Sequence, residues 1–178
     1  MLNVVLYHPE IPANTGTIGR SCVLTGTKLH LIEPIGFSLD DKMIRRSGMG
    51  YWRDLDLEVH KSYEAFIEKY GSERIWYCTK RGKSSYHEVR YKDGDYLMFG
   101  SEGAGITKSI LQKNSQTCIK IPMLHRESVS PLTHLPGPES DPADPDAISL
   151  NLSNAANIVL FEALRQLDFA GITGDFSS

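Results

Sequence analysis

The residues best suited to contact a ligand are three glycines that follow a short apolar run. Tyr96-Leu97-Met98-Phe99 leads directly into Gly100-Ser101-Glu102-Gly103-Ala104-Gly105-Ile106. Such a run predicts a buried parallel strand that ends in a loop, and glycine lets backbone approach a ligand closely. Strand, glycine loop and helix together build the ligand crevices of open α/β sheets. A tight turn without a ligand would have the same sequence, so both interpretations remain open at this point.

A second cluster, Asn14-Thr15-Gly16-Thr17-Ile18-Gly19-Arg20, follows the apolar run at 2–7 and a proline-containing loop at 8–12. Asn14 is expected to be the N-cap of a helix over 15–25 that Gly26 closes. Arg20, in the second turn of that helix, could hold a phosphate through two parallel hydrogen bonds. An ordinary surface arginine is the alternative.

The third cluster is split between Ile121-Pro122-Met123 and Ser149-Leu150-Asn151-Leu152-Ser153-Asn154-Ala155. The second part opens the most apolar helix of the chain and carries four short polar side chains. One N-cap needs fewer, and extra polar groups at a helix N-terminus suit an anion or the edge of a cofactor. Plain capping with an Asx turn would explain some of them.

The glycine spacing excludes a dinucleotide fingerprint. The loop has the order G-x-x-G-x-G instead of G-x-G-x-x-G, and Lys120 stands where that fingerprint needs an acidic residue. A nucleotide-dependent dehydrogenase is therefore disfavoured, and a test for nicotinamide binding would discriminate it.

The elements that must position these clusters alternate along the chain. Apolar runs predict strands at 2–7, 28–32, 55–59, 74–79, 96–99 and 118–121, and helical patterns fall at 62–71, after Ile106 and over 152–167. A short basic helix is expected between Asp40 and Arg46. This alternation predicts a mainly parallel α/β sheet. We expect a single domain over 1–170 and a loose tail at 171–178.

Composition narrows the class of protein. The chain has 178 residues, 40% of them hydrophobic and 23% charged, with a net charge of -3, as in ordinary soluble domains. No signal peptide or membrane span is evident. The three cysteines are widely spaced and none resembles a nucleophile; they are expected to be reduced, which fits a cytoplasmic protein. The six histidines show no ligand spacing, so no metal is expected.

Residues 124–148 interrupt the pattern with five prolines and five acids against one base. They are expected to form a long mobile loop. Without them the chain holds 18 bases and 17 acids, so an anionic partner would need local basic patches. The loop could be a lid, an acidic screen against an anionic partner, or a passive insertion.

In order, the three clusters resemble the signature motifs of the SPOUT class of RNA ribose 2′-O-methyltransferases. The opening residues 1–16, together with Gly36-Phe37, Asp40-Asp41-Lys42, Asp93-Gly94-Asp95 and Glu162-Ala163, are most similar to the small tRNA wobble-nucleotide methyltransferases of the TrmL (YibK-like) group. The resemblance covers nearly the whole chain except 124–148. Members of that class usually join Ile-Pro-Met to Ser-x-Asn-Leu-Ser within a few residues, so this insertion is a departure.

The resemblance implies an α/β fold with helices on both faces of the sheet, a C-terminal deep trefoil knot, a homodimer, and S-adenosylmethionine as cofactor with S-adenosylhomocysteine as product. The implied cofactor pocket comprises Cys78, Thr79, Gly100, Glu102, Gly105, Ile121, Met123, Ser149, Leu150 and Asn154. The positions linked to catalysis or substrate are Asn14, Arg20, Glu102, Ser149 and Asn151. Wobble cytidine or uridine of tRNA is the implied target.

The chemistry requires loss of a proton from a ribose hydroxyl as that oxygen attacks a methyl sulfonium. Guanidinium has a pKa above ~12 and no free lone pair, so Arg20 is interpreted as a phosphate clamp instead of a base. The proton would leave to phosphate, Ser149 or water, without a metal. Two patches are candidates for RNA binding, Lys42, Arg45 and Arg46 in one and Lys80, Arg81 and Lys83 in the other, although either could be a solvated surface. An RNA-binding protein that keeps the pocket without catalysis is the alternative function.

Overall fold

The computed structural model describes residues 1–39, 50–123 and 149–172. Helices and strands alternate over most of these residues. In chain order the elements are β1 (Asn3–Tyr7), α1 (Pro12–Thr25), β2 (Lys28–Ile32), the 3-10 helix η1 (Gly50–Asp54), β3 (Leu57–His60), α3 (Tyr63–Tyr70), β4 (Ile75–Cys78), β5 (Ser84–Ser85), β6 (Tyr96–Phe99), α4 (Lys108–Lys113), β7 (Cys118–Lys120) and α5 (Leu152–Gln166).

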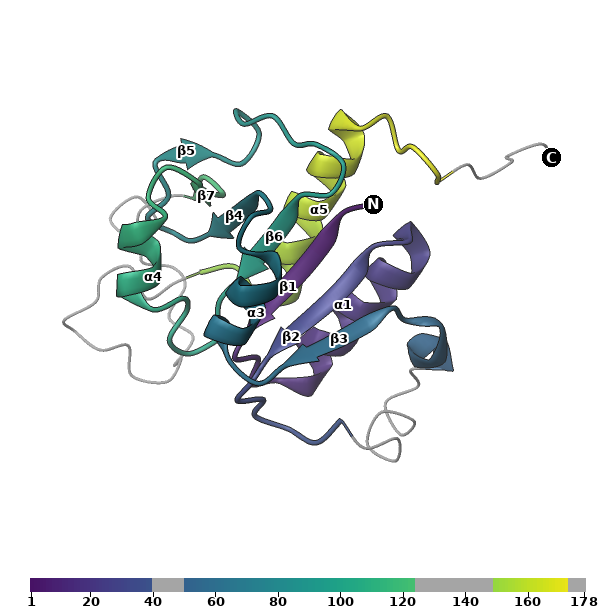
Figure 1. The fold of residues 1–178 in the computed structure, drawn as a ribbon. Coiled ribbons are helices and arrows are strands. Elements are labelled where there is room, and N and C mark those ends of the chain that lie inside the picture. Colours follow the sequence, from purple (N-terminus) through teal and green to yellow (C-terminus); the bar gives the residue numbers. More distant parts are fainter. Residues whose placement is uncertain (40–49, 124–148, 173–178) are drawn as a thin grey trace, which may run out of the picture.

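The described strands form one sheet in which every neighbouring pair is parallel. Their order is β3-β2-β1-β6-β4-β7-β5 (Figure 1). Strands β2 and β3 are added in turn on one side of β1, and the chain then crosses to β4, which lies on the other side of β1 beyond β6. The strand order therefore changes direction at β1, beside β6, which is where open α/β sheets bind ligands beyond the carboxyl ends of their strands. The predicted mainly parallel sheet is confirmed.

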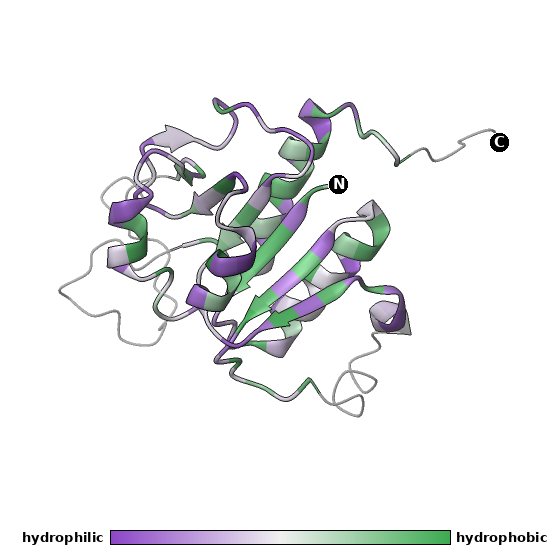
Figure 2. Ribbon diagram, viewed as in Figure 1, coloured by the Kyte–Doolittle hydropathy of each residue, from purple (hydrophilic) through white to green (hydrophobic). Residues whose placement is uncertain are grey.

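Side chains of the central strands alternate between two apolar cores. In β1, Val4 and Leu6 belong to one core, whereas Val5 and Tyr7 belong to the other. Successive side chains of a strand point to opposite faces of the sheet, and a strand buried on both faces has a continuous apolar sequence. Accordingly, β1 and β6 are mainly green in Figure 2. This explains why the central strands could be recognised from short apolar runs.

Helices cover both faces of the sheet, as the family resemblance implies. Ile18 of α1 and Leu160 of α5 pack in one core, and these two helices lie in contact. Phe66 of α3 lies in the opposite core, with Ile110 of α4 packed against it. Because α1 follows β1 directly, its N-terminus lies at the carboxyl edge of the sheet (Figure 1). The second cluster is thus placed at the edge where the glycine loop begins.

The predicted N-cap of the first helix was wrong. The helix begins at Pro12 with Ile11 as N-cap, and the Asn14 side chain caps nothing. Proline is favoured at the first helical position because its missing N–H is not needed there. Arg20 therefore lies one turn deeper than expected. Elsewhere the caps at Ser62 and Gly26 are confirmed, and the strand expected at 55–59 runs over Leu57–His60.

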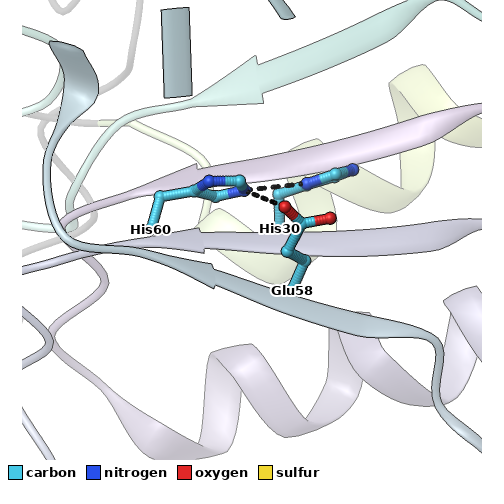
Figure 3. A group of neighbouring side chains, drawn as sticks. All are labelled: His30, Glu58 and His60. Carbon is cyan, nitrogen blue, oxygen red and sulfur yellow. Dashed lines mark hydrogen bonds and ion pairs between the residues drawn. The ribbon is translucent and has the colours of Figure 1, made fainter. Parts of the chain in front are cut away.

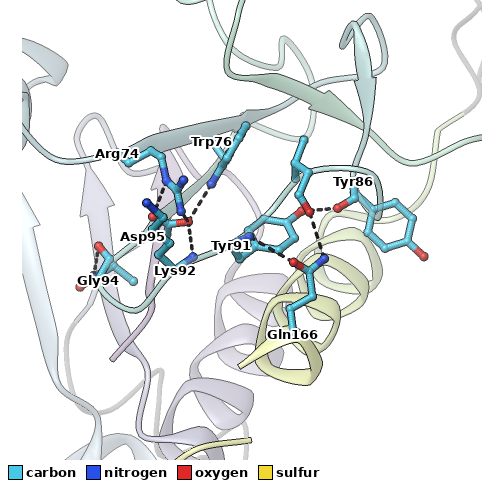
Figure 4. A network of polar contacts seen from close by, with 10 residues as sticks. Arg74, Trp76, Tyr86, Tyr91, Lys92, Gly94, Asp95 and Gln166 are labelled. Carbon is cyan, nitrogen blue, oxygen red and sulfur yellow. Dashed lines mark hydrogen bonds and ion pairs between the residues drawn. The ribbon is translucent and has the colours of Figure 1, made fainter. Parts of the chain in front are cut away.

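A buried carboxylate holds the amino-terminal edge of the sheet together (Figure 4). The Arg74 guanidinium donates to both oxygens of Asp95, over 2.7 and 2.6 Å. Trp76 Nε1 and the Lys92 N–H also donate to this carboxylate, both over 2.9 Å. Asp95 is only 3% exposed. The ion pair and the hydrogen bonds offset the cost of removing its charged carboxylate from water. This network lies at the edge opposite the glycine loop, so its role is structural.

Several expectations lie outside the described residues: the basic helix at 40–46, the insertion 124–148 and most of the tail at 171–178. The trefoil knot remains a prediction, because residues 124–148, which connect β7 to α5, are not described. The domain boundaries also remain predictions. No helix within the described ranges is both long and apolar enough to cross a membrane.

Candidate active site

A chain of side-chain hydrogen bonds joins the three sequence clusters. Asn151 Nδ2 donates to Asn14 Oδ1 over 2.9 Å, and Asn14 Nδ2 donates to Glu102 Oε1 over 2.8 Å. Asn14 is 6% exposed, and its oxygen and its amide nitrogen are both engaged. One segment each from the start of α1, the loop after β6 and the start of α5 is thereby fixed relative to the others.

Glu102 also binds the two residues that precede α1. Its carboxylate accepts hydrogen bonds from the N–H groups of Glu10 and Ile11, over 2.8 and 3.2 Å. A carboxylate at a helix N-terminus is favoured by the helix dipole. In return, the Gly103 N–H donates to the Glu10 carboxylate over 3.1 Å. The charge in the glycine loop is therefore used to attach the loop to α1.

The glycine loop is tight for two separate reasons. A Cβ on Gly100 would lie 2.2 Å from the Gly105 carbonyl carbon, so no side chain fits at Gly100. Gly105 has φ +70°, and nothing lies within 4 Å of a Cβ built there. Its N–H donates to the Ser101 carbonyl over 3.0 Å. Only glycine adopts this conformation at Gly105 without strain, and the space beside it is open.

Seven of the ten expected cofactor residues lie at or after the carboxyl ends of three adjacent strands, and the other three, Ser149, Leu150 and Asn154, lie at the start of α5. Cys78 ends β4, Gly100 follows β6 and Ile121 follows β7, and β4 pairs with both of the other strands. Thr79, Glu102 and Gly105 lie in the loops that these strands enter. Met123 and Leu150 are exposed, by 39% and 37%, as are Ser149 and Asn154. The described residues thus gather apolar surface and polar loop groups at one edge of the sheet.

The Asn151 oxygen organises the start of α5. It accepts hydrogen bonds from the N–H groups of Ser153 and Asn154, over 2.9 and 3.4 Å, and from the Ser153 hydroxyl over 2.6 Å. Capping therefore accounts for Asn151 and Ser153, whereas Ser149 and Asn154 keep their side chains exposed.

Arg20 lies apart from the Asn151–Asn14–Glu102 chain. Its guanidinium carbon is 4.9 Å from the centre of the Tyr51 ring, and the Tyr51 hydroxyl donates to the Gly16 carbonyl over 2.7 Å. Burial raises the pKa of Tyr51, which keeps this hydroxyl a donor. Six helical residues place Arg20 about 9 Å along α1 from Asn14 and about 120° around it. The exposed guanidinium is thus held by a ring and directed to solvent.

The three cysteines are free thiols. Burial raises the pKa of Cys22 to about 12 and raises those of Cys78 and Cys118. Because the thiolate is the nucleophile, this supports the sequence-based exclusion of cysteine catalysis.

Residues 1–130 match the SpoU rRNA Methylase family. The chain belongs to this family. It is 43% identical to the tRNA (cytidine(34)-2'-O)-methyltransferase of Escherichia coli K12 over 172 residues, which covers 96% of this chain and 97% of that protein. A solved structure described as giving insights into 2-OH methylation of C/U34 on tRNA has 38% identity and a TM-score of 0.76, covering 94% of this chain and 97% of that one. An AdoMet-bound rRNA methyltransferase from Sinorhizobium meliloti has 25% identity and a TM-score of 0.72, covering 93% of this chain and 56% of that one. The resemblance to SPOUT enzymes is confirmed.

The basic loop of this SpoU-family chain is held against β7. Lys80, Arg81 and Lys83 are all exposed. A Cβ on Gly82, between them, would lie 2.3 Å from the Ile119 carbonyl carbon. The loop therefore runs directly over β7, beside the carboxyl end of β4. The other basic patch, Lys42, Arg45 and Arg46, lies outside the described residues.

A polar cluster that the sequence did not predict lies on β2 and β3 (Figure 3). Ligand atoms of His30, Glu58 and His60 lie within 4.8 Å of one another. Because His30 pairs with Glu58 in the parallel register, the cluster depends on strand pairing and has no linear spacing. Lys69 donates to the Glu58 carboxylate over 2.7 Å, and Lys28 pairs with it at 2.9 Å. A divalent cation would therefore lie beside two ammonium groups, which disfavours it.

Hydrogen bonds define the protonation of this histidine pair. Asn3 Nδ2 donates to the Gly94 carbonyl over 3.4 Å, so Asn3 Oδ1 accepts from His30 Nε2 over 3.3 Å. His30 Nδ1 is then the acceptor for His60 Nε2, 3.1 Å away. Burial, with a smaller effect of the Lys28 charge, lowers the pKa of His30 to about 3, and burial lowers that of His60. Both rings are thus buried and neutral.

His8 is a second residue that the sequence did not identify. It follows β1 directly and has φ +53°, which is strained for a non-glycine residue. Its ring stacks on Tyr7 with centroids 3.8 Å apart, and its N–H donates to the Ile32 carbonyl over 3.0 Å. No sequence pattern signals a positive φ at histidine. It brings the chain from β1 to Pro9 and Glu10, beside the glycine loop.

Proposed function

We propose that this protein transfers a methyl group from S-adenosylmethionine to the ribose 2′-hydroxyl of the wobble nucleotide of tRNA, cytidine or uridine at position 34. The observation that carries the proposal is the Asn151–Asn14–Glu102 chain, which joins all three motif segments at the carboxyl edge of the sheet. Relatives that match over nearly their whole length are named tRNA (cytidine(34)-2'-O)-methyltransferase. We place the enzyme in the cytoplasm, where tRNA is used.

The cofactor pocket is proposed to comprise Cys78, Thr79, Gly100, Glu102, Gly105, Ile121, Met123, Ser149, Leu150 and Asn154. The residues fit an adenosine-containing ligand. Ile121, Met123 and Leu150 supply incompletely buried apolar surface, and the space beside Gly105 is open. The bound cofactor supplies a methyl group on a positively charged sulfur. Polar loop groups would orient its ribose and carboxylate, and closed loops would keep water out.

The chain's own catalytic task is to orient a ribose hydroxyl and accept its proton. As the hydroxyl oxygen bonds to the methyl carbon, the carbon–sulfur bond breaks and the hydroxyl proton leaves. Arg20 would fix the adjacent phosphate through its planar donor pair. The proton would pass to that phosphate, to Ser149 or to water. Asn14 and Asn151 are positioning residues that fix α1 against α5, and this reaction does not require a metal.

RNA contact is proposed at the two basic patches. Lys80, Arg81 and Lys83 are exposed beside the pocket, and Lys42, Arg45 and Arg46 carry the same charge along the sequence. A chain of net charge -3 needs such local patches to hold a polyanion.

A homodimer through α1 and α5 is proposed from their outer faces. Leu24 at the end of α1 is 71% exposed, and Ile158 and Phe161 of α5 are 37% and 46% exposed. Apolar residues on two adjacent helices favour an intermolecular contact. The family's trefoil knot is proposed for the C-terminal part of the chain.

A methyl-transfer assay with labelled cofactor and mixed tRNA tests the function. We expect the label to enter tRNA and, after alkaline hydrolysis, to remain in dinucleotides. Alkali cannot cleave the RNA backbone next to a 2′-O-methylated ribose, because cleavage needs the free 2′-hydroxyl. Binding of tRNA and cofactor without transfer would favour the non-catalytic alternative.

A further inference from the structure

A wide-open surface cavity of about 580 Å³ lies beyond the carboxyl ends of β2 and β3. Its lining residues come from two loops: Glu33, Pro34, Ile35, Phe37, Leu39 and Lys61. Because it is open to solvent, it can admit a flat group that is stacked on one side and exposed on the other. None of these residues belongs to the proposed cofactor pocket.

The loop that carries most of the lining residues is linked to the glycine loop by hydrogen bonds. The Gly36 N–H donates to the Pro9 carbonyl over 2.9 Å, and a Cβ on Gly36 would lie 2.9 Å from Glu10 Cα. Glu10 is in turn bonded through its N–H to Glu102 and through its carboxylate to Gly103. The segment Pro9–Glu10 therefore connects the loop that carries most of the lining residues to the glycine loop.

The lining has the chemistry of a nucleotide site. Ile35 and Leu39 pack against the core, whereas Phe37 is half-buried and belongs to neither core cluster. An aromatic face that the core does not use can stack on an unpaired base. The exposed Lys61 can contact a phosphate. The exposed Glu33 carboxylate can accept a hydrogen bond from an amino group on a base edge, as carboxylates do with cytosine.

We propose that this cavity binds one unstacked nucleotide of the tRNA, a neighbour of the nucleotide that is methylated. The base stacks on Phe37, Lys61 contacts its phosphate, and Glu33 favours a base with an exocyclic amino group. Because the Gly36 loop is hydrogen-bonded to Pro9, and Glu10 to Glu102, nucleotide binding here would also position the RNA relative to the glycine loop. This inference rests on the proposed function.

The principal test is Phe37→Ala. We expect the KM for tRNA to rise about 10-fold, consistent with the loss of one base stack, while kcat and cofactor affinity by calorimetry change less than twofold. Phe37→Tyr keeps the aromatic face and should keep the wild-type KM. Phe169→Ala is the matched control, because Phe169 is 39% exposed beyond the far end of α5.

Two further measurements address contact directly. Lys61→Gln should reduce the slope of log affinity against log salt by about one. A photo-crosslinking amino acid at position 37 should label a single nucleotide close to the methylated one. An unchanged KM in Phe37→Ala, or cross-links scattered over the tRNA, would overturn the proposal. So would an equal loss of cofactor affinity, since that would mean a displaced Pro9–Glu10 segment and glycine loop.

Failure of this site can be separated from failure of the proposed function. If the wild-type protein methylates tRNA but the Phe37 and Lys61 variants behave normally, the cavity proposal alone is wrong. If the wild-type protein transfers no methyl group, the proposed function is wrong. Cross-linking and salt dependence then still decide whether the cavity binds RNA.

Discussion

At the residue scale, a few side chains have roles that their neighbours in sequence do not reveal. Asn14 could be recognised as important from its motif, but capping was the wrong role, since it bonds to Glu102 and Asn151 across 88 and 137 residues. Capping preferences depend only on residues a few positions apart in the sequence, whereas the sheet brings these distant partners together. His30, Glu58 and His60 escaped prediction for the same reason. Asn151, by contrast, caps its own helix and was predictable.

Asn14→Ala should loosen the active site more than the fold. It removes two side-chain hydrogen bonds and leaves the Asn151 amide unpaired, which costs about 1–3 kcal/mol in stability. We expect turnover to fall at least about 10-fold, because misplacement of about 1 Å can cost 10²-fold in rate. Asn157→Ala on α5 is the control, since Asn157 Oδ1 has no hydrogen-bond partner among the described residues. Equal turnover in the two variants would exclude a positioning role for Asn14.

Arg20→Lys should abolish most methyl transfer while cofactor binding persists. Lysine retains the charge but lacks the planar pair of donors and the ring contact with Tyr51. The measurement is single-turnover methylation with calorimetry of the cofactor. Arg165→Lys, in the exposed pair with Glu162, is the control and should have little effect. Near-normal turnover in Arg20→Lys would indicate simple charge attraction in place of a phosphate clamp.

At the scale of elements, the sequence located most strands and helices because buried parallel strands are uniformly apolar and helices carry caps. The start of α1 differs from the prediction because proline is favoured at the first helical position, so the helix begins at Pro12 and not at residue 15. The two-residue strand β5 is too short for any periodicity. The glycine loop was predicted as a close approach of backbone to ligand. Its geometry gives different reasons, a steric one at Gly100 and a positive φ at Gly105.

Gly105→Val tests the glycine loop, and Gly94→Val is a matched control. Both glycines have positive φ, +70° and +86°, and both have open space where a Cβ would stand. Each substitution should destabilise the fold by about 1–2 kcal/mol through left-handed strain. Only Gly105 lies at the proposed pocket, so calorimetry should show weaker cofactor binding in that variant alone. Similar affinities in both folded variants would refute the location of the pocket.

At the scale of the whole molecule, the sheet order places three distant motifs at one edge and the structural Asp95 network at the other. The sequence predicts parallel strands but does not encode their order directly. That order follows from which faces pack together. The family resemblance therefore supplied what periodicity could not, namely that residues near 14, 102 and 151 meet.

The buried histidine pair should make stability depend on pH. The pKa of His30 is about 3 in the folded protein and about 6.5 when unfolded, so the unfolded state binds the extra proton between these values. The free energy of unfolding is therefore not reduced by this group above pH 6.5, and it decreases as the pH falls below 6.5. Well below pH 6.5, the loss approaches about 1.4 kcal/mol per pH unit for this one group.

Urea unfolding between pH 6.5 and 5 measures this effect in a window above most carboxyl titrations. His30→Gln should flatten the dependence, because its amide can still hydrogen-bond without titrating. Exposed His87, replaced by Gln, is the control and should leave the wild-type slope. A slope unaffected by His30→Gln would contradict the assignment of a neutral buried pair.

The most direct test of the central claim is the position of the methyl group in the product. Purified protein, unmodified tRNA and S-adenosylmethionine would be incubated, and nuclease fragments of the tRNA analysed by mass spectrometry against a reaction without cofactor. The account predicts a gain of one methyl group on the ribose of nucleotide 34, cytidine or uridine. A methyl group on a base, a ribose methyl at another position, or no methylation of any tRNA would contradict it.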